Sequence, residues 1–434
     1  PSGRMHRCKV LSSGALRDRI ERAEGELLQL EGASALPVGF LTGMTLGEVG
    51  SSEGVKIVGQ GARPGEIVLA EPAPDGLEAG ASVEIRAGEE APLLAARMIT
   101  GTAAGRRLPP MAMRLATTRG TNALLERAGA RTVHLITEGF EDLLTIGDQH
   151  RPDLFALSIQ RPEPLPELVV GVNERVAADA SVLRAPDLDA LRGQLEKLAA
   201  DGIRSASIAL LHGHRNDAHE CLIEHLLREL GFEYVARSSA LSPFQGLLRR
   251  SQTSSTDAYL GPVISGYLGG VGGGLDDDRS TLHVMTSAGG LVRASNYRSM
   301  DSLLSGPAGG VVGAAMTGRQ AGIERVIAFD MGGTSTDVSR FDGDFEYVFS
   351  HSVGPVEMAV LCELILRGPQ TVGELRTRIK RFGQERSATE IQGALNDLMD
   401  REDGPFAVKL AREPGRRESR YAHLLCGPVE EEVA

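Results

Sequence analysis

The chain has 434 residues, of which 41% are hydrophobic and 24% are charged, and its formal net charge is −12 at pH 7. This composition is typical of a globular protein of two or three domains, and it excludes a disordered chain. The acidic balance argues against general nucleic-acid binding, and no apolar run reaches the ~20 residues of a membrane-spanning helix.

The four cysteines are scattered along the chain and form no CxxC pair. They are Cys8, Cys221, Cys362 and Cys426. This spacing predicts neither a zinc site nor a disulfide framework. The first nine residues lead into no apolar stretch of the kind found in a signal peptide. We therefore expect a cytoplasmic protein with reduced thiols.

The first hundred residues combine one predicted helix with several short predicted strands. The helix is expected over residues 13–30. Short apolar segments separated by Pro and Gly predict a small β insertion at about residues 50–90, with strands at 55–61, 66–69 and 83–86.

From about residue 91, predicted helices and apolar strands alternate, which indicates a mixed or parallel sheet. Helices are expected at residues 92–100, 121–128 and 188–200, and a glycine-rich loop with a small-residue helix is expected at 306–322. Strands are expected at residues 132–136, 205–211, 282–286 and 325–330.

The composition changes after Gly354, where helical periodicity replaces the strand signals. Three helices are expected, at residues 356–366, 371–381 and 389–401. Two short segments that follow, 407–410 and 419–425, would pair as the wing of a winged helix. We expect a domain boundary at residues 351–357.

The clearest chemical motif is FDMGGTSTDVSR, residues 329–340. An apolar strand delivers Asp330 to its end, and Gly332 and Gly333 let the backbone bring N–H groups up to phosphate oxygens. Asp330 suits binding Mg²⁺ through water, or orienting the water that attacks a γ-phosphate. Hydroxyl donors and the return strand follow at Thr334, Ser335, Thr336 and Asp337. On spacing alone, an ordinary β-hairpin turn is an equal alternative.

This motif resembles the second phosphate loop of the hydantoinase A/5-oxoprolinase family, within the actin, sugar-kinase and heat-shock-chaperone ATPase superfamily. LSGPAGGVVGAA, residues 304–315, resembles the segment that precedes that loop in the family. Further similar segments are ATTRGTN (116–122), VHLITEGFEDLLTIGD (133–148), QHRPDLF (149–155) and LHGHRNDAHE (211–220). The resemblance spans roughly residues 5–354.

The resemblance implies an α/β fold of actin-like ATPase (ribonuclease H-like) lobes, with ATP and Mg²⁺ as cofactors. Members of the family use ATP to phosphorylate an amide or ketone oxygen before hydrolysis or carboxylation. The implied substrate is a cyclic amide such as 5-oxoproline or a hydantoin. The implied partners are a hydantoinase B-like subunit and further copies of the chain, in a homo- or hetero-oligomer.

The resemblance also implies roles for individual residues. Asp330 would be the catalytic residue and would hold Mg²⁺ through water. The cofactor-binding residues would be Gly306, Gly309, Gly332, Gly333, Thr334, Ser335, Thr336 and Asp337. Candidates for the substrate side are Arg119, Asn122, Asp148, His150 and Arg151. The alternative for this last group is a solvated or structural role in surface loops.

The sequence lacks two segments that the family uses to bind ATP. The superfamily's first phosphate loop, a D-x-G-G-T-F-T-D-like segment, has no counterpart before Phe329. The adenosine-binding segment expected well after residue 350 is also missing. We therefore expect incomplete lobes, and a polypeptide that does not turn over ATP by itself.

The tail resembles a different family. VLCELILRGPQTVGELR (360–376) and VKLAREPGRRESRYAHLL (408–425) are similar to the YceH-like bacterial family, whose fold is a winged helix. The predicted domains are therefore a hydantoinase/oxoprolinase N-terminal domain (1–178), the start of an actin-like domain (179–354) and a small C-terminal winged-helix domain (355–434).

The tail keeps a non-catalytic alternative open, a DNA- or protein-binding module. Candidate phosphate contacts are Arg376, Arg378, Lys380, Arg381, Arg416, Arg417 and Arg420. Twelve Lys/Arg against fourteen Asp/Glu in residues 355–434 favour protein interaction or a structural role over DNA binding. An artificial or decayed fusion of two truncated families is a further interpretation.

Overall fold

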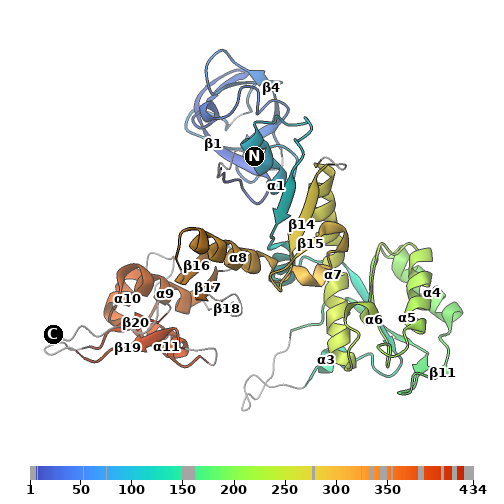
Figure 1. Cartoon of the computed structure of the whole chain (residues 1–434). Helices are drawn as coiled ribbons and strands as arrows, with labels where there is room; N and C mark the ends of the chain where they lie inside the picture. Colours follow the sequence, from blue (N-terminus) through green and yellow to red (C-terminus); the bar gives the residue numbers. More distant parts are fainter. Residues whose placement is uncertain are drawn as a thin grey trace. The chain divides into compact units, whose positions relative to one another are not determined.

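The computed structural model describes residues 6, 8–51, 53–74, 76–148, 162–275, 279–323, 325–331, 336–342, 349–352, 355–379, 386–401, 405–412 and 418–424. Contacts divide the chain into two compact units, one of residues 1–286 and 290–303 and one of residues 287–289 and 304–434. Figure 1 labels their helices and strands. Within the described part of the chain, no helix is long and apolar enough to cross a bilayer.

The first unit begins with a closed barrel of strand order β1-β2-β5-β4-β3-β6 (Figure 1). Its strands are β1 (Ala15–Glu24), β2 (Leu27–Leu30), β3 (Thr45–Glu48), β4 (Val55–Gln60), β5 (Glu66–Leu69) and β6 (Ser82–Arg86). Apolar side chains such as Leu28, Leu30, Ile57 and Ile85 fill the interior, as expected for a small barrel. Three predicted strands, at 55–61, 66–69 and 83–86, are thereby confirmed.

The predicted helix at residues 13–30 is wrong, because this segment forms strands β1 and β2. Gly25 has a φ of 60° and turns the chain so that Glu24 pairs with Leu27. A register shift between Ile20 and Arg22 breaks the alternation of side chains that would identify a strand. The β structure therefore begins at Ala15, well before the predicted insertion at residues 50–90.

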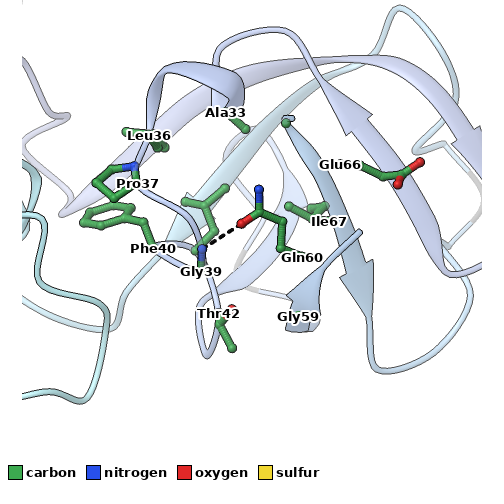
Figure 2. A pocket seen from close by; sticks show the side chains of 12 residues that line it. Ala33, Leu36, Pro37, Gly39, Phe40, Thr42, Gly59, Gln60, Glu66 and Ile67 are labelled. Atoms are coloured by element: carbon green, nitrogen blue, oxygen red, sulfur yellow. Dashed lines mark hydrogen bonds between the residues drawn. The ribbon is translucent and has the colours of Figure 1, made fainter. Parts of the chain in front are cut away.

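Figure 2 shows a small hollow on the barrel surface. The backbone N–H of Gly39 donates to Oε1 of Gln60 at 2.7 Å and closes the turn beside Phe40. The hollow has a volume of about 20 Å³, which is room for a single water molecule. This hollow is therefore too small for a substrate.

The first unit also contains a parallel sheet of order β13-β12-β8-β9. Val133, Leu135 and Ile208 pack on one face against two helices. The alternate residues, including His134 and Ser207, face the long helix α7 on the other side. The elements are β8 (Thr132–Thr137), β9 (Leu168–Val172), α4 (Leu188–Ala200), β12 (Ser205–Ala209), α5 (Ala218–Glu229), β13 (Tyr234–Arg237) and α7 (Leu247–Gly273).

Helix α7 extends past this sheet to a second one, of order β15-β14-β7. Tyr267 and Val271 near its end pack with Leu93 and Leu115 in a separate core. The elements here are α1 (Ala91–Thr100), β7 (Ala112–Leu115), α2 (Arg119–Leu125), β14 (Thr281–Met285) and β15 (Leu291–Arg293). Short connecting elements are α3 (Leu143–Ile146), β10 (Arg175–Val176), β11 (Val182–Arg184) and α6 (Ser238–Leu241).

The second unit starts with helix α8 and an antiparallel sheet of order β16-β17-β18. Three helices and a short hairpin follow, with a core that includes Leu361, Leu375, Leu395 and Tyr421, and Ile327 of β16 packs against it. The elements are α8 (Ser305–Gln320), β16 (Arg325–Met331), β17 (Thr336–Asp342), β18 (Phe349–Ser352), α9 (Pro355–Arg367), α10 (Val372–Ile379), α11 (Ala388–Met399), β19 (Ala407–Lys409) and β20 (Tyr421–His423).

The predicted elements from residue 91 onward are confirmed, with shifts of a few residues at their ends, except that helix α8 also covers the glycine-rich loop expected after residue 306. The α/β class and the tail's order of three helices and a hairpin follow from them. The domain boundaries after residues 178 and 354 and the winged-helix assignment stay predictions.

Candidate functional site

Strands β16 and β17 form an antiparallel hairpin around the FDMGGTSTDVSR motif. Asp330 pairs with Asp337, and Met331 pairs with Thr336, so both acidic residues lie next to the turn. The residues that connect the strands, Gly332, Gly333, Thr334 and Ser335, lie outside the described residues. The flanking strands are confirmed, and the contacts of the motif with phosphate stay a prediction.

Helix α8 packs closely on this hairpin. A Cβ atom at Gly318 would lie 2.4 Å from Cγ2 of Val326, so only glycine permits this approach. Gly306 and Gly309 lie in the first turns of the same helix. The backbone N–H of Leu304, just before the helix, donates to the Ser287 hydroxyl at 3.1 Å. The small residues of α8 thus allow the helix to lie directly against strand β16.

Arg119 begins helix α2, directly after the carboxyl end of strand β7. Its guanidinium pairs with Glu90 at 2.7 Å and lies over the Tyr267 ring, 4.7 Å from the centroid. Asn122 lies three residues further along the same helix. Sequence reasoning missed Glu90 and Tyr267, because their contacts with Arg119 join segments far apart in the chain. A charged side chain held this way is positioned, although 43% of it stays exposed.

The other substrate candidates are not gathered around Arg119. Asp148 follows helix α3 and lines a groove beside helix α7. His150 and Arg151 lie outside the described residues. Arg119 and Asn122 thus share helix α2, whereas Asp148 lies in the groove beside helix α7.

Comparison with known proteins shows which family this sequence resembles. Residues 87–231 match the model of the hydantoinase/oxoprolinase N-terminal region, and residues 250–380 match the hydantoinase/oxoprolinase model. Over these residues the chain belongs to the hydantoinase/oxoprolinase family. The 5-oxoprolinase of Saccharomyces cerevisiae is 39% identical over 289 residues, which cover 59% of this chain and 22% of the relative. The chain therefore spans about a fifth of the length of that relative.

Two further comparisons cover the fold and the tail. The nucleotide-free structure of acetone carboxylase matches 56% of this chain and 39% of its own, with a TM-score of 0.50 and 20% identity, so the likeness is one of fold alone. A UPF0502 protein of Citrobacter koseri is 50% identical over 82 residues, which are 19% of this chain and 38% of that protein. The C-terminal part is thus similar to the UPF0502 (YceH-like) family, as the sequence predicts.

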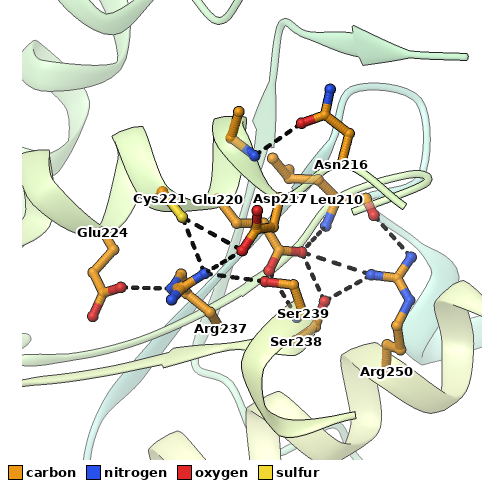
Figure 3. Close-up of polar contacts among 11 residues, drawn as sticks. Leu210, Asn216, Asp217, Glu220, Cys221, Glu224, Arg237, Ser238, Ser239 and Arg250 are labelled. Carbon is orange, nitrogen blue, oxygen red and sulfur yellow. Dashed lines mark hydrogen bonds and ion pairs between the residues drawn. The ribbon is translucent and has the colours of Figure 1, made fainter. Parts of the chain in front are cut away.

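In the hydantoinase/oxoprolinase N-terminal region, a buried polar cluster lies at the carboxyl ends of strands β12 and β13 (Figure 3). Oε1 of Glu220 accepts from the Leu210 backbone at 3.0 Å and from the Ser238 hydroxyl at 2.7 Å. Arg250 donates to the same hydroxyl at 2.7 Å and to the Leu210 carbonyl at 2.8 Å. These bonds tie helices α5, α6 and α7 to the end of strand β12.

A second buried cluster links strands β8 and β12. The Thr137 hydroxyl accepts from the Leu211 backbone at 2.8 Å and donates to Glu174. The other oxygen of Glu174 lies 2.6 Å from Nδ1 of His219. Connections leave in opposite directions from β8 and β12, so this is the switch point where open α/β sheets bind ligands. The side chains of Thr137, Glu174 and His219 are buried, however, so the cluster stabilises the carboxyl ends of these two central strands.

In the YceH-like tail, Arg378 and Arg420 serve internal contacts, whereas Arg376 on helix α10 is exposed. Arg378 donates to Oε1 of Gln370 at 2.7 Å, and Gln370 in turn bonds to the Tyr421 backbone. Arg420 also has a partner and is half-buried. Lys380, Arg381, Arg416 and Arg417 lie outside the described residues. Arg378 and Arg420 thus do not present free guanidinium groups to a DNA backbone.

Proposed function

We propose that this chain forms part of an ATP-dependent amidohydrolase of the hydantoinase/5-oxoprolinase type. The reaction would phosphorylate the carbonyl oxygen of a cyclic amide and so prepare its ring for hydrolysis. The supporting comparison is the 39% identity to a 5-oxoprolinase. The observation that carries the proposal is the register of the β16–β17 hairpin, which sets Asp330 opposite Asp337, one pair before the end of the described ladder.

In this proposal the hairpin holds the phosphates of ATP. Backbone N–H groups and hydroxyls of residues 332–336 would donate to phosphate oxygens, and Asp330 would hold Mg²⁺ through water. Such contacts supply the positioning and charge neutralisation on which phosphoryl transfer depends. The actin-like lobes, the hydantoinase B-like subunit and oligomer formation belong to the same proposal.

The test is 5-oxoproline-dependent ATP hydrolysis, measured with the chain and with a supplied hydantoinase B-like subunit. Asp330→Ala should lower the rate by about 100-fold or more, the usual effect of losing one group that stabilises developing charge. Asp342→Ala is the matched control, because this aspartate lies at the far end of the same hairpin, where it is opposite Arg325 in the strand register. Equal and measurable rates of ATP hydrolysis in the two variants would remove the role proposed for Asp330.

A further inference from the structure

A groove in the first unit has the size and lining of a small-molecule site. Its volume is about 570 Å³, within the usual range for ligand pockets. It lies between the end of helix α2, helix α3, the segment 162–166 and one face of helix α7. Its apolar lining residues are Leu124, Leu144, Pro162, Pro164, Leu165 and Pro166.

One cation lines the groove. Arg127 has a φ of 54°, and its Nη2 donates to the carbonyl oxygen of Glu163 at 2.8 Å, which links two walls of the groove. Its other N–H groups have no hydrogen-bond partner among the described residues. A guanidinium fixed by one bond and free on its remaining edge is suited to a carboxylate.

Uncharged polar groups of helix α7 form the opposite wall. Gln252, Ser255 and Thr256 have the spacing of one helical face. Within the described part of the chain, the side chains of Gln252 and Thr256 have no hydrogen-bond partner. An amide ring needs one donor for its carbonyl and one acceptor for its N–H, and these side chains offer both.

The Ser255 hydroxyl is held from behind by buried groups. It lies 3.3 Å from Nδ1 of His134 and 3.3 Å from the Ser207 hydroxyl, and the same nitrogen lies 2.8 Å from Ser207. Burial lowers the pKa of His134 to about 3, so this support carries no charge at neutral pH. The floor of the groove is therefore polar and neutral.

Two carboxylates, Asp148 and Glu163, also line the groove. They repel negative charge, so within the groove a carboxylate of a ligand is favoured only beside Arg127. Opening a 5-oxoproline ring converts its amide into a carboxylate and an ammonium, so the product no longer offers the ring amide that the side chains of helix α7 would bond.

We propose that this groove binds a lactam that carries one carboxylate, with Arg127 contacting the carboxylate and Gln252, Ser255 and Thr256 bonding to the ring amide. The choice of 5-oxoproline as the ligand rests on the proposed function. The groove itself is defined by residues that the sequence analysis did not select, apart from Asp148.

The test is calorimetric titration of the whole chain, without ATP, with 5-oxoproline, 2-pyrrolidinone and glutamate. Wild-type protein should bind 5-oxoproline about tenfold more tightly than the other two, since 2-pyrrolidinone lacks the carboxylate and glutamate lacks the ring amide. Arg127→Gln should remove the preference over 2-pyrrolidinone, and Thr256→Val should weaken both lactams. Arg192→Gln is the matched control, because Arg192 pairs with Glu229 at 2.7 Å on helices α4 and α5.

The proposed lactam site would be refuted by the absence of 5-oxoproline binding at millimolar concentration. Equal binding by wild type, Arg127→Gln and Thr256→Val would refute it as well. Circular dichroism spectra identify any variant that fails to fold. Lactam-dependent ATP hydrolysis that needs Asp330 but is unchanged in Arg127→Gln would support the proposed function and refute the groove as the lactam site. Binding of 5-oxoproline that depends on Arg127 and Thr256, without any ATP hydrolysis, would support the lactam site but not the proposed function.

Discussion

Nη1 of Arg250 lies 3.6 Å from Oε1 of Glu220, and neither side chain is more than 2% exposed. Ser238 and the backbone of Leu210 complete the hydrogen bonds of the pair. Two charges removed from water in this way depend on each other, because either one alone would be left buried without a counterion.

Removing one partner of this pair should be strongly destabilising. Glu220→Ala is expected to cost about 3–5 kcal/mol, and the double variant Glu220→Leu/Arg250→Met should cost less than the sum of its parts. Urea-dependent hydrogen exchange of the peptide that contains β12 measures the effect locally. Glu229→Ala on the same helix is the control, because its ion pair is exposed and should be worth less than about 1 kcal/mol. Equal effects at both positions would contradict the prediction.

Buried His134 should make the first unit sensitive to acid. Its ordinary pKa is 6.5 and burial lowers its pKa to about 3, so below pH 6.5 the unfolded chain binds a proton that the folded protein excludes. The stabilisation is therefore complete above pH 6.5 and is lost as the pH falls toward 3. At pH 5 the loss is about 2 kcal/mol.

Hydrogen exchange of strand β8 at pH 7.5 and pH 5 measures this loss. His134→Gln should flatten the dependence, since glutamine does not titrate. His225→Gln is the control, because His225 is exposed on helix α5 and should leave the dependence unchanged. An identical pH dependence in wild type and His134→Gln would show that another group is responsible.

The sequence predicts the elements whose signal is local. Strand β8 and helix α4 follow from an apolar run and from a regular helical spacing. Residues 13–30 misled the prediction because a bulged barrel strand places its apolar residues at spacings close to those of a helix. Only the pairing of β1 with β2 and β6, which is not local, decides the conformation.

The functional residues also divide into those with a local sequence signal and those brought together only by the fold. The hairpin around Asp330 could be predicted, because strand, glycines and return strand are consecutive in the chain. The groove beside α7 could not, since Arg127 and Gln252 come together only when helix α7 packs against the sheet. The pairing of Glu174 with His219 depends likewise on the order of the strands, which a single sequence does not reveal.

Gly318 should tolerate no side chain. In an exposed helix, replacing glycine by alanine stabilises by roughly 0.5–1 kcal/mol, but here the new Cβ would lie 2.4 Å from Val326. Gly318→Ala is therefore expected to cost about 1–3 kcal/mol through overpacking. Hydrogen exchange of the peptides that contain α8 and β16 measures the change. Gly313→Ala in the same helix meets nothing within 4 Å and should slow exchange instead. Stabilisation by both substitutions would refute the close contact.

Ser387 should stabilise the first turn of helix α11. Its hydroxyl accepts from the Glu390 backbone at 3.2 Å, and the Glu390 carboxylate accepts from the Ser387 backbone at 2.8 Å, which is a capping box. Ser387→Ala removes one of these bonds and should destabilise the tail by about 1 kcal/mol. Because the cap acts on the first turn, exchange should rise first in residues 388–391 and less in the rest of α11. Thr389→Ala, two residues along at an exposed position, should leave exchange unchanged or slow it slightly, as alanine is the better helix former. Faster exchange in Thr389→Ala than in Ser387→Ala would mean that the first turn is held by packing rather than by its cap.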